Sequence, residues 1–393
     1  MRRTPLMILF FTVFLDLIGF GLVIPVLPIY AEDLGAAALT IGLIEASFSG
    51  AQFFFAPFWG ALSDRMGRKP VLVISIAVMM FSYLILANAS TIWLLFIARA
   101  VAGIGAANVS IANAYVSDIS PVERRARNFG IIGAAMGLGF IFGPPLGGFL
   151  KDFYGMDGVG YVAAALSLLN LLLAWLLLPE SHFDLNKSRS LFTTPLREFK
   201  TVFPRVTLRS LLLTQLIFMA AFSMLQMTAS LLWKNRYMLR EVEIGYTFGF
   251  IGICIVIIQG LLLGRLSRLV GERKLFVAGN FMMAIGLISM PYVPVEVFVP
   301  LGLFGLIFIA FGTAFFTPTL SSLLTQTAGE DEQGKVLGLM QAMGSLGRVA
   351  GPVTGGFFYG IAYFLPFTVA AGIMVITGSL ALWIVRVRLY SES

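Results

Sequence analysis

The chain has 393 residues, of which 58% are hydrophobic and only 12% are charged, and its mean hydropathy is +0.91. Soluble domains carry about 25% charged residues, so this composition excludes a water-soluble globular protein. The net charge of +7 does not indicate a nucleic-acid partner, because the basic residues are dispersed in short segments instead of forming one patch. With one cysteine and one histidine, Cys254 and His182, we expect no metal site and no cofactor.

Apolar stretches of about 20 residues recur along the whole chain and predict helices that span a bilayer. The N-terminal stretch begins like a signal peptide but runs on to Ile29 without a cleavage site of small residues, so we expect it to be retained as the first span. The twelve predicted spans are 6–29, 40–62, 71–90, 92–115, 127–150, 158–179, 208–232, 243–264, 274–294, 297–323, 333–359 and 362–385.

The distribution of Lys and Arg predicts the orientation, because these residues stay on the cytoplasmic side. Most of the 27 lie in segments that are cytoplasmic if both termini are cytoplasmic, and the loop 233–243 is the exception. The longest polar stretch separates six spans from six. It predicts an N-terminal bundle (1–180), a cytoplasmic linker (181–207) and a C-terminal bundle (208–393). Within the linker, residues 195–203 fit a short amphipathic helix on the membrane surface or a plain linker equally well.

The two halves resemble each other in sequence. GALSDRMGRKP (60–70) returns as GRLSRLVGERK (264–274), and GIIGAAMGLGFIFGPPLGGF (130–149) returns as GLMQAMGSLGRVAGPVTGGF (338–357). Parallel repeats predict two helical bundles related by a pseudo-two-fold axis along the membrane normal, with substrate bound between them.

The stretch 60–70 gathers charges in the cytoplasmic loop between the second and third spans. Its glycines permit a sharp turn, a carboxylate there can accept from the free N–H groups of a helix start, and guanidinium groups can bridge carboxylates. Ordinary positive-inside anchoring explains the cations but neither Asp64 nor the glycines. We therefore predict a conformational latch that closes the cytoplasmic mouth. Its residues are Gly60, Asp64, Arg65, Gly67, Arg68, Lys69 and Asp118.

These motifs resemble those of the major facilitator superfamily, particularly its twelve-helix drug:proton antiporters of the tetracycline-efflux kind. RAVAGIGAA (99–107) is similar to the Arg-led motif of helix four, GAAMGLGFIFGPPLGG (133–148) to the antiporter motif of helix five, and LDLIGFGLVIPVLP (15–28) to the start of drug-efflux members. The resemblance implies an all-α fold of twelve transmembrane helices in two six-helix bundles. It also implies that Arg99 supports proton coupling.

The resemblance further implies that Asp64, Arg68 and Asp118 form an inter-domain latch. The second loop copy departs from the pattern, because Arg268 replaces the acidic residue and Gln326 stands opposite Asp118, so we expect the charge network in the N-terminal half only. The helix-five motif implies a packing interface and hinge. Its residues are Gly133, Gly137, Gly143, Pro144 and Gly147.

Ionisable residues inside predicted spans are site candidates, since a charge near the bilayer centre costs about 2.5–3.5 kcal/mol. Asp16 and Glu45 are the predicted proton carriers, with Arg99 biasing their ionisation. A purely structural hydrogen bond to a neighbouring helix is the alternative for Asp16. Other polar residues in the spans are candidates for a substrate cavity: Gln52, Asn113, Gln226, Gln259, Gln341 and Arg348. For Arg348 the equal alternative is a structural role, in which it reaches the membrane surface or pairs with a backbone carbonyl.

We therefore predict a proton-coupled secondary transporter that exports lipophilic small molecules, as in drug efflux and antibiotic resistance, by alternating access. Embedded carboxylates favour a cationic or amphipathic substrate, although Arg99 and Arg348 are compatible with an anionic one. Tetracycline itself is disfavoured, because the C-terminal spans lack the acidic and histidine residues of tetracycline exporters. The alternative is a lipid, sugar or metabolite transporter of the same fold with different coupling.

Other classes of protein are excluded by missing motifs. The chain has no GxxxxGK[ST] loop and no nucleophile–base arrangement, so we expect neither an ATP-driven pump nor an enzyme. We expect a monomer in the bacterial cytoplasmic (inner) membrane, whose partners are a small-molecule substrate, protons and the lipid bilayer.

Overall fold

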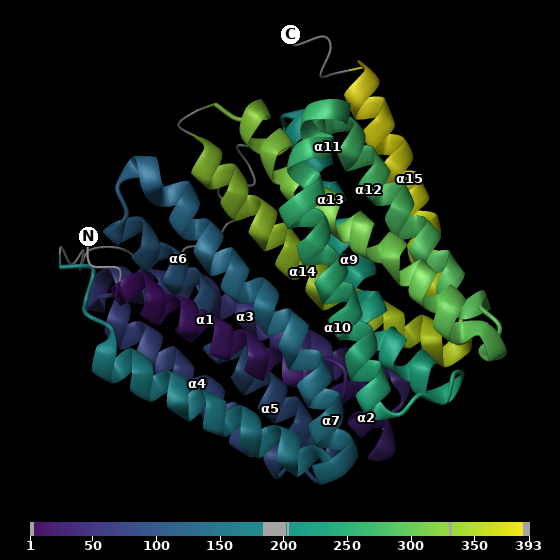
Figure 1. The fold of residues 1–393 in the computed structure, drawn as a ribbon, viewed down its shortest axis with the longest axis horizontal. Helices are drawn as coiled ribbons and strands as arrows, with labels where there is room; N and C mark the ends of the chain where they lie inside the picture. Colours follow the sequence, from purple (N-terminus) through teal and green to yellow (C-terminus); the bar gives the residue numbers. More distant parts are fainter. Residues whose placement is uncertain (1–3, 184–201, 203, 330–331, 388–393) are drawn as a thin grey trace. The chain divides into compact units, whose positions relative to one another are not determined.

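The computed structural model describes residues 4–183, 202, 204–329 and 332–387, which form helices and no strands (Figure 1). Apart from Val202, the predicted surface segment 195–203 lies outside these residues. In chain order the α-helices are α1 (Thr4–Val23), α2 (Leu27–Asp33), α3 (Ala38–Met66), α4 (Arg68–Ala87), α5 (Ile92–Gly105), α6 (Asn108–Ile119), α7 (Val122–Leu177), α9 (Val206–Asn235), α10 (Glu241–Ile257), α11 (Leu263–Val270), α12 (Glu272–Ser289), α13 (Leu303–Thr327), α14 (Gln333–Ile361) and α15 (Leu365–Val387). Short π-helical and 3-10 turns lie at Ile258–Leu262, Met290–Tyr292, Val295–Val297 and Phe298–Gly302.

In the described part of the chain, 10 helical stretches are long and apolar enough to cross a membrane. One of them contains two helices that meet at Gly155, where φ is 71° and ψ is −174°. Helix α14 has 29 residues but falls outside the ten, because Gly, Ser, Gln and Arg dilute its apolar residues. All twelve predicted spans fall on helices, and the predicted all-α polytopic architecture is confirmed.

Two spans predicted as single helices are broken in the structure. In the first, α1 ends at Val23 and α2 begins at Leu27. Pro25 and Pro28 explain the break, because proline cannot donate a backbone hydrogen bond and clashes with the preceding turn of a helix.

The fourth predicted span is broken at Ala106 and Ala107, between α5 and α6. Two side chains of α3 bind carbonyl groups at this break. Nε1 of Trp59 donates to the carbonyl of Ile104 at 2.5 Å, and Nε2 of Gln52 donates to that of Ala106 at 3.1 Å. The break persists inside an apolar helix because its polar groups are satisfied by a neighbouring helix.

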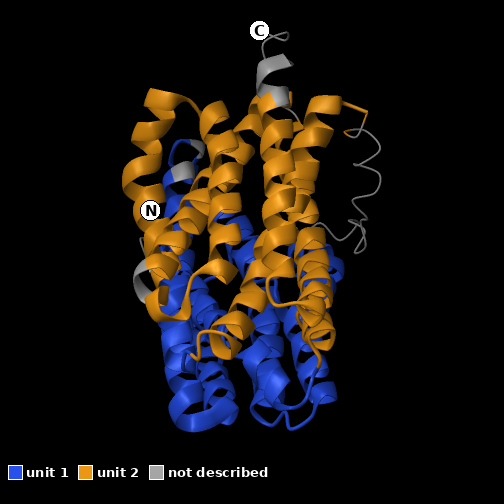
Figure 2. Ribbon diagram, turned by 90° about the vertical axis from the view of Figure 1, so that its right-hand side faces the viewer, with its two compact units in different colours: residues 1–36, 47–194, 239–249 blue, residues 37–46, 195–238, 250–393 orange. Residues whose placement is uncertain are grey.

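The chain divides into two compact units, blue and orange in Figure 2. Unit 1 comprises residues 1–36, 47–194 and 239–249, and unit 2 comprises residues 37–46, 195–238 and 250–393. Helices α3 and α10 therefore each contribute to both units. The predicted bundles 1–180 and 208–393 with linker 181–207 follow chain order and stay a prediction.

Small residues of α7 allow it to pack closely against α1 within unit 1. A Cβ added to Gly139, Gly143 or Gly147 would collide with atoms of α1, including the side chain of Leu17 and the carbonyl of Leu22. The remaining predicted interface positions differ: a Cβ on Gly133 would meet no atom within 4 Å, Pro144 is buried, and Gly137 is half-buried.

The same arrangement recurs in unit 2, where α14 packs against α9. A Cβ on Gly347 or Gly351 would collide with the carbonyl groups of Leu216 and Ala220. The repeat in the sequence is thus matched by a repeat in the contacts.

A second repeated contact joins α7 to the first turns of α10, and α14 to the first turns of α3. A Cβ on Gly148 would collide with the carbonyl of Glu241, and one on Gly356 with the carbonyl of Ala38. The contacts are reciprocal: a Cβ on Gly245 would collide with the carbonyl of Pro144, and one on Gly42 with the carbonyl of Pro352. Because of these close approaches, the first turns of α3 fall in unit 2 and those of α10 in unit 1, while the remaining turns of each helix fall in the other unit.

Large apolar side chains face outward. Phe54 is 70% exposed, Trp93 77% and Ile376 68%. Soluble monomers rarely expose extended apolar surface, whereas a bilayer covers it without cost.

Candidate functional site

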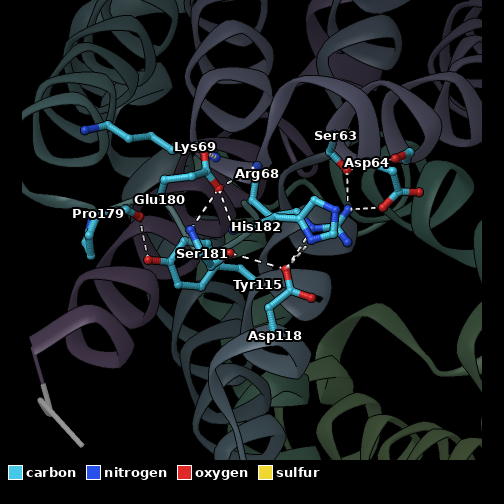
Figure 3. Close-up of polar contacts among 11 residues, drawn as sticks. Ser63, Asp64, Arg68, Lys69, Tyr115, Asp118, Pro179, Glu180, Ser181 and His182 are labelled. Carbon is cyan, nitrogen blue, oxygen red and sulfur yellow. Dashed lines mark hydrogen bonds and ion pairs between the residues drawn. The ribbon is translucent and has the colours of Figure 1, made fainter. Parts of the chain in front are cut away.

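Arg68, the first residue of α4, binds two carboxylates (Figure 3). Its Nη1 lies 2.6 Å from Oδ1 of Asp64, and its Nε donates to Oδ2 of Asp118 at 3.0 Å. Nη1 also donates to Oγ of Ser63 at 2.6 Å. The guanidinium therefore joins α3, α4 and α6, and its side chain is only 10% exposed. Charge-assisted bonds of this kind are about twice as strong as neutral ones.

Glu180 caps the N-terminus of α4. Its Oε1 accepts from the backbone N–H of Arg68 at 2.9 Å, and its Oε2 accepts from that of Lys69 at 3.1 Å. Free N–H groups at a helix start favour an anion. The sequence predicts a carboxylate in this role without identifying it. The signal is topological: Glu180 directly follows the sixth span, whose end lies on the same side of the membrane as the loop between the second and third spans.

Gly67 makes room for this cap. Its backbone has φ 98° and ψ 159°, and a Cβ there would lie 2.5 Å from Oε2 of Glu180. Two further residues that the sequence did not assign to the latch reach the cluster. Oγ of Ser181 donates to Oδ2 of Asp118 at 3.3 Å, and Nδ1 of His182 lies 3.8 Å from the same oxygen.

The structure gathers Asp64, Arg68 and Asp118 as the sequence predicts, and every contact above lies within unit 1. Arg65 and Lys69 are half-buried, and Lys69 enters the cluster through its backbone. A Cβ on Gly60 would meet no atom within 4 Å. A latch between the two halves stays a prediction.

The corresponding loop of unit 2 has its charges reversed. Glu272 begins α12 where Arg68 begins α4, and its Oε2 accepts from Oγ of Ser322 at 2.5 Å and from Nε2 of Gln326 at 2.9 Å. Nε of Arg268 donates to a carbonyl of its own helix. In unit 1 a cation lies between carboxylates, whereas in unit 2 a carboxylate accepts from neutral donors.

Asp16 lies midway along α1 and binds the residue that follows the break between α5 and α6. Nδ2 of Asn108 donates to Oδ1 of Asp16 at 2.6 Å, and Oδ1 of Asn108 accepts from the hydroxyl of Ser75 in α4. Asp16 is half-buried, while Asn108 is 1% exposed and Ser75 is fully buried. The sequence pointed to Asp16 but not to Asn108, since nothing in the pattern of the fourth span predicts the break.

Arg99 is 5% exposed and lies over aromatic rings. Its Cζ is 4.4 Å from the ring centroid of Phe48 and 6.0 Å from that of Phe20. Both rings belong to unit 1 with Arg99, whereas half-buried Glu45 belongs to unit 2. Proton coupling by Asp16, Glu45 and Arg99 together stays a prediction.

The predicted cavity residues lie in several helices. Gln52 binds the broken span as described above. Asn113 in α6 and Gln226 in α9 are half-buried, while Gln259 in the π-helical turn and Gln341 in α14 are exposed. Arg348 in α14 is half-buried. In the described ranges, no group of three or more His, Cys, Asp or Glu side chains could hold a metal ion.

Comparisons with known proteins identify relatives over nearly the whole chain. The model of the Major Facilitator Superfamily matches residues 9–267 and 255–391. The class C tetracycline resistance protein of Escherichia coli is 32% identical over 368 residues, covering 89% of this chain and 88% of that protein. Multidrug resistance protein 2 of Bacillus subtilis (strain 168) is 27% identical over 389 residues, covering 95% and 94%.

Solved structures show the same similarity. The human organic anion transporter MFSD10 is 27% identical with a TM-score of 0.72, covering 96% of this chain and 99% of that chain. The nucleoside transporter NupG is 16% identical with a TM-score of 0.80, covering 99% and 100%, which is a likeness of fold alone.

Proposed function

Because the chain belongs to the major facilitator superfamily, we propose that it is a proton-coupled secondary transporter that exports lipophilic small molecules by alternating access. Membership of this family makes the chain a multi-pass membrane transporter rather than an enzyme. Relatives named for resistance to tetracycline and to multiple drugs support export of drug-like compounds.

The observation that carries the proton coupling is the contact between Asp16 and Asn108. Transporter sites are typically built where membrane helices are discontinuous, and Asn108 is the first residue after such a break. The Nδ2 donor of Asn108 requires an acceptor on Asp16, which an ionised carboxylate and a protonated one both offer. Asn108 therefore holds the carboxyl group in place in either protonation state, as a proton carrier requires.

The Arg68 cluster supports the second part of the proposal, a conformational latch. Asp64, Arg68, Asp118 and Glu180 hold the ends of α3, α4 and α6 and the residues after α7 in one fixed arrangement. A bundle that rocks as a rigid body needs such ties between its helix ends. We propose that this cluster stabilises one end state of the transport cycle.

The remaining features of the proposal follow from the orientation rule and the family. The protein lies in the bacterial cytoplasmic membrane with both termini in the cytoplasm, and it works as a monomer. Tetracycline itself is disfavoured as the substrate, because the predicted C-terminal spans hold no histidine and no acidic residue other than Glu243, the first residue of the eighth span.

The test uses the purified full chain in liposomes with a pH-sensitive dye trapped inside. Lipophilic cations, tetracycline, neutral drugs, sugars and lysolipids are added one at a time. We expect proton movement that depends on a drug-like compound, is lost in Asp16→Asn, and is unchanged in Asp157→Asn. Asp157 is the matched control because it is an exposed carboxylate in the same unit.

Two outcomes would count against the proposal. Undiminished proton movement in Asp16→Asn would remove Asp16 from the mechanism. Movement of sugars or lysolipids without protons, from folded protein, would favour the alternative carrier with different coupling.

A further inference from the structure

Arg348 lies midway along α14 and lacks a compensating charge. Its Nη2 donates to Oγ of Ser345 in the same helix at 2.9 Å, and within the described residues no carboxylate forms an ion pair with it. A guanidinium has five N–H donors, so most of its capacity is unused. A cation at membrane depth is costly unless it is paired, and its presence indicates a functional partner.

Gln215 brings a second polar group to the same place from α9. Its side chain is 3% exposed, and its Oε1 has no hydrogen-bond partner in the part of the chain that the structure describes. Buried polar atoms are nearly always paired, so an unpaired one indicates a missing partner.

Gly344 has no side chain, which allows the side chains of Gln215 and Arg348 to come close to the backbone of α14 at this position. A Cβ at Gly344 would lie 3.0 Å from Nε2 of Gln215 and 3.7 Å from Nη1 of Arg348, so both donors approach one point. The Cγ of Met219 would lie 3.6 Å from the same point. The site thus combines donors from two helices of unit 2 with an adaptable thioether.

We propose that Arg348 and Gln215 bind the ionised acid group of an amphipathic organic anion, with its apolar body against Met219. The planar fork of arginine matches a carboxylate in a bidentate geometry. The Nε2 of Gln215 adds a donor, and its unpaired Oε1 accepts from an adjoining hydroxyl or amide of the ligand. The inference rests on the proposed transport function and names the substrate class, an anion, where Asp16 and Glu45 alone favour a cation.

The experiment measures binding and needs no proton gradient. Purified full-length protein at pH 7.4 is titrated with fluorescein, 1-naphthoate and decanoate, each against its own methyl ester, and ligand-induced thermal stabilisation is recorded. We expect the wild-type protein to bind at least one acid more tightly than its ester. A charge-assisted hydrogen bond contributes about 1.5–3 kcal/mol, so Arg348→Met should weaken binding of the acid about 10- to 100-fold and leave the ester unchanged.

A second pair of variants keeps the test independent of the charge. Gly344→Ala places a methyl group between the two donors and should weaken binding of the acid. Gly338→Ala makes the same change in the same helix, where a Cβ would meet no atom within 4 Å, and should not. Arg348→Lys should fall between wild type and Arg348→Met, since it keeps the charge but loses the fork.

The proposal is overturned if the wild-type protein binds none of the acids better than its ester, or if Arg348→Met keeps the wild-type ratio of acid to ester affinity. Equal effects of Gly344→Ala and Gly338→Ala would also contradict it. Asp16→Asn separates this inference from the transport proposal. This variant should abolish proton movement but still bind the acid more tightly than its ester. The transport proposal and the anion-binding proposal can therefore fail independently.

Discussion

Gly67→Ala tests whether Glu180 caps the N-terminus of α4 and whether this cap requires a residue without a side chain at position 67. The backbone of Gly67, with φ 98° and ψ 159°, lies in a region essentially restricted to glycine. Occupying such a region with another residue costs on the order of 1–3 kcal/mol. The alanine Cβ would in addition lie 2.5 Å from Oε2 of Glu180 and displace that carboxylate. Loss of a helix cap costs about 1–2 kcal/mol.

Gly271→Ala supplies the matched control, because Gly271 precedes α12 as Gly67 precedes α4. Its φ is 87° and its ψ is 147°, so the backbone strain is similar, but a Cβ there would meet no atom within 4 Å. The difference between the two variants therefore isolates the cap. A cap worth about 1–2 kcal/mol corresponds to a factor of about 5–30 in a local equilibrium.

Amide hydrogen exchange followed by mass spectrometry reports the effect where it arises. For each variant we express the exchange rate relative to that of the same amides in wild type. For the amides of Arg68 and Lys69 in Gly67→Ala, we expect this relative rate to be about 5- to 30-fold higher than for the first-turn amides of α12 in Gly271→Ala. Glu180→Gln, which keeps the shape but removes the charge, should accelerate the same amides by a smaller factor. Equal acceleration in the two glycine variants would refute the assignment of Glu180 as the cap.

The remaining predictions concern the other contacts. Asn108→Ala should reduce proton-coupled transport in liposomes by about tenfold or more, because it removes a hydrogen bond to a carboxylate worth about 1.5–3 kcal/mol; wild-type rates would contradict this. Gly147→Val should lower the free energy of unfolding by about 1–3 kcal/mol through overpacking against α1, whereas Gly133→Val should change it by less than about 0.5 kcal/mol. Equal stabilities would mean that the α1–α7 contact adapts. Arg68→Gln removes the cation that binds two carboxylates and should cost about 3–5 kcal/mol, against about 1 kcal/mol for Glu272→Gln, whose partners are neutral. Equilibrium unfolding in denaturant compares the two, and the opposite order would show that the reversed network is the stronger one.

The sequence by itself determined the helical architecture. The thickness of a bilayer sets the length of each apolar run, and the intervening Gly, Pro and charged residues mark its ends, so the spans are local properties of the chain. The glycine repeats could be found for the same reason: close helix packing requires small residues at fixed spacing, whatever the partner helix. The stripes at 139–147 and 347–355 accordingly pack against α1 and α9.

The charged loop could be predicted in part. Asp64 and Arg68 are four residues apart across a tight turn, so their contact follows from local geometry. Asp118 could be proposed because the fourth span ends on the same side of the membrane.

Only the tertiary structure decided which distant residues complete each site. Glu180 caps α4, Asn108 binds Asp16, and Gln215 meets Arg348 across Gly344. In each case the partners are separated by more than ninety positions in the chain. Hydropathy determines that a helix crosses the membrane but not which neighbour it packs against or how it is rotated about its axis. A hydrogen bond depends on both, because its strength falls steeply with distance and angle.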